Sequence, residues 1–371
     1  MRLEYDRRIS RATELMAAEG LDALVLSTSN KSQSLFYLTG LDRLCANLVL
    51  LRNGRNTLLI LDQDLLDAKD TAHADDIKTY SSTIAQFKAI AETLEECGLK
   101  DGSVGVETPF LRATFYDSLK AALPYAITIT DATKVTGQLR LIKTQYEIEL
   151  VRKASAIAVK ALESATDLVR SGISESEIAA TTEYELRKAG AEETAMSTFI
   201  SSGRRTSAPH PPVSNRKLVK GDPVLIDLHP RIQGYCSDLA ATFTTPPAET
   251  KYSKQIRQIL EARSAAIQDL RNGDLFSKFH QDYLKHLGKS DFILPAMPFF
   301  NNVHGVGTSA SDPPSFWYPV DVKIQPGMVF ALAQSPIRPK QPSEIGIKFE
   351  DTYLITETGV ERLTTFEYPQ A

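Results

Sequence analysis

Two aspartates in one predicted β-hairpin are the first side chains in this sequence whose spacing suggests chemistry. The segment from Asp222 to Phe243 reads DPVLIDLHPRIQGYCSDLAATF. Its apolar runs favour two strands, and the Gln233-Gly234 pair between them is typical of a turn. In such a hairpin Asp227 and Asp238 lie side by side, where they can share one or two divalent ions through oxygen ligands. Alternatively, one of these acids belongs to the turn and the other is a surface charge.

Three more polar residues stand in segments that could reach this hairpin. Asp227 itself follows an apolar run, so it is expected at a buried strand end, where an unpaired carboxylate is costly. His210 lies in a turn-rich loop before the hairpin, and His304 lies in a Gly- and Ser-rich loop after it. His210 could instead be merely solvated, because loops are polar. Glu350 lies in the predicted strand GIKFEDTYLIT, and a metal ion is one partner that a carboxylate among apolar neighbours can find.

Composition limits the classes of protein to which the chain can belong. Its 371 residues are many for one hydrophobic core, so we expect two domains. The net charge of −4 gives no support for binding nucleic acid or membrane through bulk electrostatics. No apolar run approaches the ~20 residues that span a bilayer. Three cysteines without paired spacing, and a charged N-terminus without an apolar signal core, favour the cytoplasm.

The order of predicted elements places the domain boundary near residue 138. Strands alternate with helices through the first part of the chain, which indicates an α/β domain at residues 1–138. The predicted helices cover 5–19, 83–97 and 111–122, and the predicted strands cover 23–26, 48–51, 57–61 and 103–106. Residues 36–40 are predicted as a strand that runs into a turn. A second domain, residues 139–371, begins with a long amphipathic helix whose capping box is Thr144 and Glu147. Another helix is predicted over 174–188.

Five segments, in this order, resemble the pita-bread metallopeptidases. That family contains Xaa-Pro dipeptidases (prolidases), Xaa-Pro aminopeptidases, methionine aminopeptidases and creatinase. The segments are SAPHPPVSNRKLVKGDPVLIDL, GYCSDLAATF, HGVG, QPGMVFAL and GIKFEDTYLIT. The N-terminal half, including FYLTG, is similar to the domain that precedes the catalytic one in prolidases and creatinases. The resemblance implies an α/β N-terminal domain followed by an α+β pita-bread domain, with Asp227, Asp238, His304 and Glu350 as metal ligands.

Two substitutions change the expected substrate side of the site. Ser311 stands where the family has a second histidine that assists proton transfer and binds substrate. His229 stands where the family usually has a glycine, two residues after the first aspartate. Because alternate residues of a strand share a face, His229 is expected in the same pocket as Asp227. We expect His210, His229 and Ser311 to contact the substrate, and His210, His304 and Glu350 to take part in catalysis.

A third substitution removes one metal ligand that the family has. The position of a metal-binding glutamate is Ala333 here, and the next residue, Gln334, points to the opposite face of an extended strand. Two divalent ions carry four positive charges, whereas only three carboxylates remain. We therefore expect at most one tightly bound ion (manganese, cobalt or zinc) or none, and weak or absent cleavage of Xaa-Pro dipeptides. Without metal, the acids require raised pKa values, a protonated histidine or a cationic substrate group.

Three functions remain open at this point. The first is a hydrolase of an amide or other C–N bond, similar to Xaa-Pro dipeptidases and aminopeptidases but with a reduced metal site. The second is a metal-independent, creatinase-like hydrolase of a small cationic compound, with His210 as general base. The third is a binding protein without catalysis. The resemblance also implies a dipeptide or small-molecule substrate and a homodimer.

Overall fold

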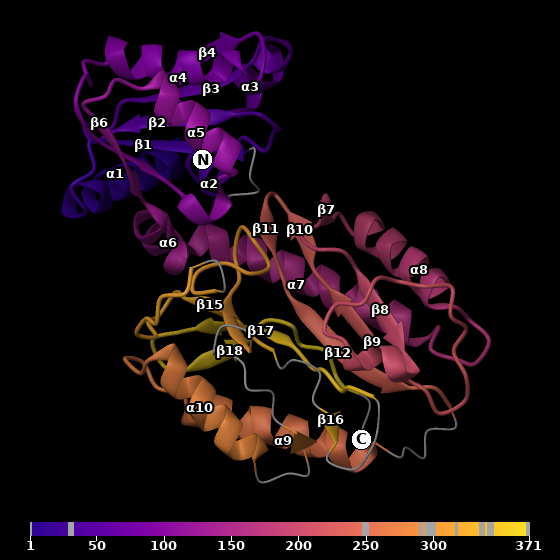
Figure 1. Cartoon of the computed structure of the whole chain (residues 1–371). Helices are drawn as coiled ribbons and strands as arrows, with labels where there is room; N and C mark the ends of the chain where they lie inside the picture. The colour runs from indigo at the N-terminus through magenta and orange to yellow at the C-terminus, as the bar shows by residue number, and fades with distance from the viewer. Residues whose placement is uncertain are drawn as a thin grey trace. The chain divides into compact units, whose positions relative to one another are not determined.

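The chain folds into two compact units, Met1–Arg140 and Leu141–Ala371, in a computed structural model. The structure describes residues 2–28, 33–246, 252–288, 292–293, 302–315, 318–333, 338–339 and 345–368. Within these ranges, no helix is long and apolar enough to cross a lipid bilayer. The helices and strands of both units are labelled in Figure 1.

The N-terminal unit is a mixed six-stranded sheet with helices on both faces. Its helices are α1 (Arg2–Ala18), α2 (Ser34–Thr39), α3 (Leu65–Thr71), α4 (Ala85–Glu96), α5 (Ala113–Ala122) and α6 (Thr133–Leu141). Its strands are β1 (Ala23–Ser27), β2 (Asn47–Leu51), β3 (Asn56–Leu61), β4 (Asp76–Tyr80), β5 (Gly102–Val106) and β6 (Ile127–Asp131), in the spatial order β4-β3-β2-β1-β5-β6. Alternation along β1 separates two cores: Leu24 and Leu26 pack in one cluster with α1, and Val25 packs in another with α4 and α5.

The predicted strand over 36–40 is wrong, because FYLTG belongs to the short helix α2 and its cap. Gly40 ends this helix with a φ of 76°, a left-handed conformation that glycine adopts without strain. Its backbone N–H donates to the carbonyl oxygen of Phe36 at 2.7 Å. Since Leu35, Tyr37 and Leu38 are all buried, the segment does not show the alternating burial of a strand.

The C-terminal unit begins with two capped helices, as the sequence predicts. Helix α7 (Gln145–Thr166) starts with the capping box of Thr144 and Glu147, and α8 (Glu175–Lys188) starts with one formed by Ser174 and Glu177. In each box the cap hydroxyl accepts from the third backbone N–H, and the glutamate accepts from the cap backbone. A second helix pair, α9 (Ser253–Asp269) and α10 (Phe276–Leu287), follows later in the chain.

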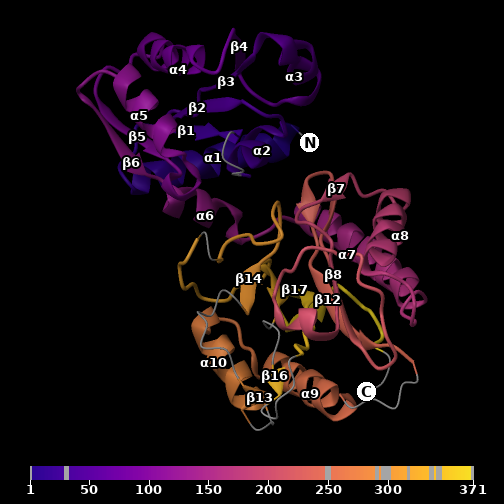
Figure 2. The same ribbon diagram turned by 45° about the vertical axis from the view of Figure 1, so that its right-hand side comes forward.

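Two sheets between these helix pairs are joined by one backbone bridge. The strands are β7 (Glu193–Thr194), β8 (Phe199–Ser202), β9 (Pro223–Leu228), β10 (Pro230–Ile232), β11 (Tyr235–Cys236), β12 (Leu239–Thr244), β13 (Phe292–Ile293), β14 (Val303–Gly305), β15 (Val329–Leu332), β16 (Arg338–Pro339), β17 (Asp351–Ile355) and β18 (Val360–Arg362). The first of these sheets has the order β12-β9-β8 and the second β14-β15-β17-β18, and the remaining strands form two smaller sheets, β11-β10-β7 and β13-β16. Ala240 and Glu350 pair across the junction between them. In both ribbon views α7 and α8 lie beside the first sheet, and α9 and α10 lie beside the second (Figures 1 and 2).

Candidate metal centre

The register of one hairpin brings the two aspartates together. Strands β9 and β12 pair antiparallel, with Ala240 opposite Asp227 and Leu239 opposite Leu228, so Asp238 stands just before β12 and close to Asp227. Both carboxylates are buried, with Asp227 0% and Asp238 3% exposed. The chain between them makes a smaller hairpin, β10–β11, whose turn residues Gln233 and Gly234 have positive φ values. The predicted hairpin is confirmed.

Glu350 and His304 reach the same place from the second sheet. The Glu350 N–H donates to the Ala240 carbonyl oxygen at 2.8 Å, which holds Glu350 beside β12 one residue before β17 begins. His304 lies in β14 opposite Ala331 of β15. Its ring Nε2 is 3.2 Å from Oε1 of Glu350. Four side chains from two separate sheets therefore face one buried volume.

Two overlapping groups in this volume have the ligand types and spacing of a metal site. Asp238, His304 and Glu350 form one group, and Asp227, His229 and Asp238 form the other. Within each group the ligand atoms lie within 4.8 Å of one another. Oδ1 of Asp227, Oδ1 of Asp238 and Oε1 of Glu350 are buried without a hydrogen-bond partner. Since buried polar atoms are normally satisfied, three inward-facing lone oxygens fit a divalent cation well.

Lys348 supplies a positive charge that the sequence reasoning missed. Its ammonium Nζ lies 2.6 Å from Oδ2 of Asp227 and 2.8 Å from Oε2 of Glu350. The residue is only 5% exposed. Each of these two carboxylates thus turns one oxygen to the ammonium and leaves its other oxygen unpaired. The sequence held a signal: Lys348 is two residues before Glu350 in an extended segment, so both side chains share a face.

The charges in this cluster shift the pKa values of its three acids in different directions. Burial opposes ionisation of Asp227 and of Glu350, but the Lys348 ammonium, together with His229 beside Asp227 and His304 beside Glu350, holds the pKa of both carboxyls below the usual range. Burial raises the pKa of Asp238 well above its usual value, and the neighbouring carboxylates of Glu350 and Asp227 raise it further. Burial also disfavours the Lys348 ammonium, yet Asp227 and Glu350 raise its pKa overall. Lysine therefore stays charged, and Asp238 is the acid of the three whose ionisation is least favourable.

Two further predicted histidines lie around the cluster. His229 is 1% exposed, and its Nε2 stands 3.2 Å from Oδ1 of Asp227 and 3.4 Å from Oδ1 of Asp238. His210 is exposed in its loop, with its ring 4.9 Å from that of Phe199 between centroids. Partial removal from water lowers the pKa of His210, and the Lys348 ammonium lowers it further against the opposing pull of Asp227. His210 is therefore largely neutral at pH 7.

The substituted positions have other roles in the structure. Ser311 is half-buried, and its backbone N–H donates to the hydroxyl of Ser309 at 3.3 Å. The next residue, Asp312, is buried and forms an ion pair of 3.4 Å with Lys143. Ala333 is buried just after β15 and offers no ligand atom. Gln334 lies outside the described residues.

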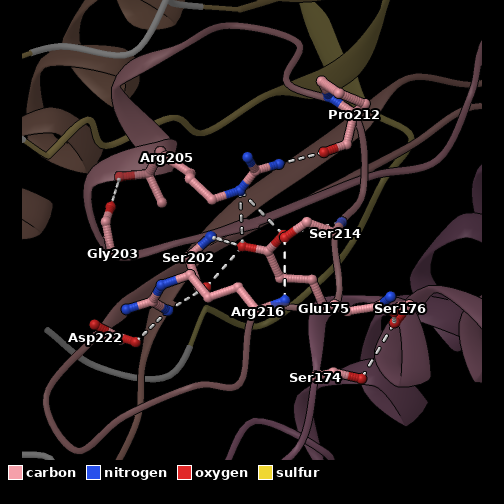
Figure 3. Close-up of polar contacts among 12 residues, drawn as sticks. Ser174, Glu175, Ser176, Ser202, Gly203, Arg205, Pro212, Ser214, Arg216 and Asp222 are labelled. Atoms are coloured by element: carbon pink, nitrogen blue, oxygen red, sulfur yellow. Dashed lines mark hydrogen bonds and ion pairs between the residues drawn. The ribbon is translucent and has the colours of Figure 1, made fainter.

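A buried glutamate, which the sequence reasoning also missed, holds the loop that carries His210. Glu175 is 0% exposed at the start of α8, and its carboxylate lies between two serines in Figure 3. It accepts from the hydroxyls of Ser202 (2.7 Å) and Ser214 (2.6 Å), and from Nε of Arg205 (3.2 Å). Ser202 precedes the loop and Ser214 follows His210, so one carboxylate fixes both ends of the loop.

Comparison with protein families decides the classification of the chain. Residues 149–357 match the metallopeptidase family M24, and residues 8–142 match the creatinase/prolidase N-terminal domain. The chain belongs to metallopeptidase family M24. Its two matched segments and the described architecture confirm the predicted two-domain pita-bread fold, and the protein is a peptidase-like hydrolase. M24 membership implies the use of a divalent metal, which the acidic and histidine groups above can accommodate.

Relatives of this M24 protein are similar over nearly its whole length. The Xaa-Pro dipeptidase of Pyrococcus furiosus is 26% identical over 366 residues, covering 97% of this chain and 98% of the relative. That of Pyrococcus horikoshii is 27% identical over 369 residues, covering 98% of each. Among solved structures, the prolidase from Pyrococcus horikoshii has a TM-score of 0.83 at 25% identity, covering 98% of this chain and 100% of the other. An Xaa-Pro dipeptidase from Bacillus anthracis has a TM-score of 0.84 at 23% identity, covering 99% of each chain, and supports the fold.

Proposed function

We propose that this chain hydrolyses dipeptides and uses one tightly bound divalent ion held by Asp238, His304 and Glu350. The observation that carries the proposal is the charge balance of the buried cluster. Asp227, Asp238 and Glu350 contribute three negative charges and Lys348 one positive charge, which leaves two negative charges. One divalent ion neutralises this remainder, whereas a second would leave an excess of buried positive charge.

The ion and the side chains around it have separate roles. When bound, it supplies electrophilic activation of the scissile carbonyl and of water. Lys348 orients Asp227 and Glu350 by holding one oxygen of each, so that their other oxygens face inward. His210 is neutral and exposed, and its ring N–H can donate a hydrogen bond to the substrate carboxylate or to the oxyanion that develops during attack.

A dipeptide is the proposed substrate class because the relatives named above are Xaa-Pro dipeptidases. Dipeptides with proline in the second position are the first to test. We expect weak turnover of these, since Ala333 removes a ligand and Ser311 replaces a proton-transferring histidine. The similarity to Xaa-Pro dipeptidases gives no support to the creatinase-like or non-catalytic alternatives. Catalytic roles for His210, His304 and Glu350, and substrate contacts for His229 and Ser311, remain part of the proposal.

Metal content and dipeptide hydrolysis, measured on the same preparations, test the proposal. Protein treated with chelator is reloaded with Mn²⁺, Co²⁺ or Zn²⁺, analysed for bound ion, and assayed on proline and non-proline dipeptides. We expect about one ion per chain and hydrolysis that depends on it. Glu350→Gln should lose both, while Glu367→Gln, a change at an exposed acid, should lose neither. Full activity of the metal-free protein, or of Glu350→Gln, would refute the proposal.

We also propose a homodimer, because the family resemblance implies one. Each chain has a mass of 40.9 kDa, so light scattering at micromolar concentration should return twice that value. A monomer mass at this concentration would contradict the proposal.

A further inference from the structure

The two sheets of the C-terminal unit pair through their backbones at Ala240 and Glu350. The Ala240 N–H donates to the Glu350 carbonyl oxygen at 3.1 Å, and the Glu350 N–H donates to the Ala240 carbonyl oxygen at 2.8 Å. In an antiparallel ladder, the next residues that exchange such hydrogen bonds stand two positions further along each strand. Here those residues are Asp238, of the candidate metal centre, and Thr352, of β17. The next backbone pair is therefore expected between Asp238 and Thr352.

A threonine side chain takes the place of that backbone pair. The Thr352 N–H donates to the hydroxyl of Thr364 at 3.1 Å and not to Asp238. The Thr352 hydroxyl instead donates to the Asp238 carbonyl oxygen at 2.8 Å and accepts from the Asp238 N–H at 3.0 Å. Both residues are buried. One hydroxyl thus makes both of the hydrogen bonds to Asp238 that a paired backbone would make.

The remaining capacity of the Thr352 hydroxyl is also filled by buried groups. A hydroxyl has one proton and two lone pairs. Since the proton of Thr352 goes to Asp238, Thr352 accepts in its 3.4 Å contact with the Ser237 hydroxyl. Ser237 accepts in turn from the hydroxyl of Ser155, on α7, at 3.1 Å, and both serines are fully buried. The Thr352 hydroxyl therefore cannot turn away from Asp238 without losing a hydrogen bond.

The same arrangement recurs on the other side of the Ala240–Glu350 pair. The Thr242 hydroxyl donates to the Lys348 carbonyl oxygen at 2.9 Å and accepts from the Lys348 N–H at 2.9 Å. Both of these residues are buried as well. Threonine hydroxyls thus continue the connection between the sheets where direct backbone pairing ends, and the residue that each one holds carries an ionisable side chain of the cluster.

We propose that Thr352 is the positioning residue for Asp238. The Asp238 carboxylate is buried and its Oδ1 has no hydrogen-bond partner, so the direction of this oxygen depends on where the backbone of residue 238 lies. Thr352 fixes that backbone through both its N–H and its carbonyl oxygen. It acts through Asp238, whose place in the ion site is itself proposed above. Groups that orient a metal ligand typically change metal affinity by about tenfold or more when they are removed.

Two substitutions of Thr352 separate its hydroxyl from its packing. Thr352→Val keeps the branched shape and removes the hydroxyl, whereas Thr352→Ser keeps the hydroxyl. Calorimetry on metal-free, full-length protein should give an Mn²⁺ affinity that is about tenfold or more weaker in Thr352→Val and close to wild type in Thr352→Ser. The visible absorption of bound Co²⁺ should change only in Thr352→Val. Thr352→Ala is the second replacement should the valine variant not fold.

Two matched threonine variants are the controls. Thr182 is buried in α8, and its hydroxyl donates at 2.7 Å to Ile178 of the same helix, so Thr182→Val should change neither affinity nor spectrum. Thr242→Val removes the matching contact to Lys348 and should keep the wild-type Co²⁺ spectrum, because Lys348 is not a ligand of the ion. Wild-type Mn²⁺ affinity in Thr352→Val overturns the inference. So does an equal loss in Thr352→Ser or Thr182→Val, because packing would then be responsible.

Amide hydrogen exchange in chelator tests the same contact without metal or activity. Peptides that contain residue 238 should exchange faster in Thr352→Val than in wild type or Thr352→Ser, because the Asp238 N–H loses its partner. Equal exchange in all three proteins overturns the inference. Failure of the proposed function is distinguishable, since wild type would then bind no ion and hydrolyse no dipeptide whatever the exchange rates are.

Discussion

Replacing Lys348 with methionine tests whether an internal ammonium balances the acids of the metal centre. Methionine is unbranched and similar in length, so the variant removes the charge and keeps most of the packing. Lys348 contacts Asp227 at 2.6 Å and Glu350 at 2.8 Å, and all three residues are buried. The substitution therefore leaves two buried carboxylates without their common partner.

The structure sets both the expected size and the upper limit of the loss in unfolding free energy. At an effective dielectric constant near 20, each contact is worth roughly 6 kcal/mol of attraction, much of which the desolvation of the ammonium offsets. In the variant one carboxyl can take up a proton and so limit the damage. For a group with an ordinary pKa of about 4, that costs ~4 kcal/mol at pH 7. We expect a loss of about 4 kcal/mol, in the range of about 3–5 kcal/mol typical of broken buried ion pairs.

The expected pH and metal dependence separate this effect from a general packing defect. Urea unfolding in chelator should show a deficit that shrinks by about 1.4 kcal/mol for each unit that the pH falls below 7, because protonation becomes cheaper. Mn²⁺ should restore much of the stability, since it binds only the folded variant and replaces the missing charge. Lys220→Met, at an exposed position before β9, is the control and should match wild type. A deficit below about 1 kcal/mol in chelator at pH 7, or one that is constant with pH, would refute the reasoning.

Three other changes probe the chain at separate points. Ala333→Glu should restore a carboxylate ligand and tighten Mn²⁺ binding by about tenfold or more in calorimetry; unchanged affinity would mean that position 333 does not face the ion. Glu175→Gln should lower kcat/KM by about tenfold or more, mainly through KM and without changing metal affinity, because the carboxylate that accepts from Ser202, Ser214 and Arg205 loses its charge. Glu175→Asp should recover part of the loss. Equal kcat/KM values for wild type and both variants would be evidence against anchoring of the His210 loop by Glu175. Burial lowers the pKa of His280 from 6.5 to about 4, so the unfolded chain binds the extra proton between these values and wild type should lose about 2 kcal/mol from this residue between pH 7.5 and 5; His280→Gln should lose less over that interval, and parallel stability curves would contradict the assignment.

Interactions between residues close in sequence could be predicted from the sequence alone. The capping boxes that start α7 and α8 join residues three apart, so their hydrogen bonds depend on the local chain and little else. The hairpin that pairs Asp227 with Asp238 is similar, because strand alternation and a turn of suitable residues fix its register. The segment FYLTG was misread because five residues contain too little periodic signal to separate a short helix from a strand.

The order of motifs also identified the pita-bread resemblance, and with it four of the residues that face the buried volume. Family matching over most of the chain confirms the fold that this resemblance implied. The absence of a ligand at Ala333 could be read directly from the printed residues. The printed residues do not show which group takes the place of that ligand.

Tertiary structure alone decided how the charges of the centre are balanced. Lys348 and its partner Asp227 are 121 residues apart, and the Glu175 carboxylate reaches Ser202 and Ser214 across 27 and 39 residues. No pattern in the local sequence links such positions, because the tertiary fold decides which polar groups come within a few ångströms of a buried ionic group. His229 could be assigned to the pocket from alternation, but its position between two unpaired oxygens depends on how both strands and the bridge to Glu350 pack. The sequence therefore determined which ligand types are present. Long-range packing decided that Asp227 and Glu350 share the Lys348 ammonium, because an unpaired charge is too costly in this buried region.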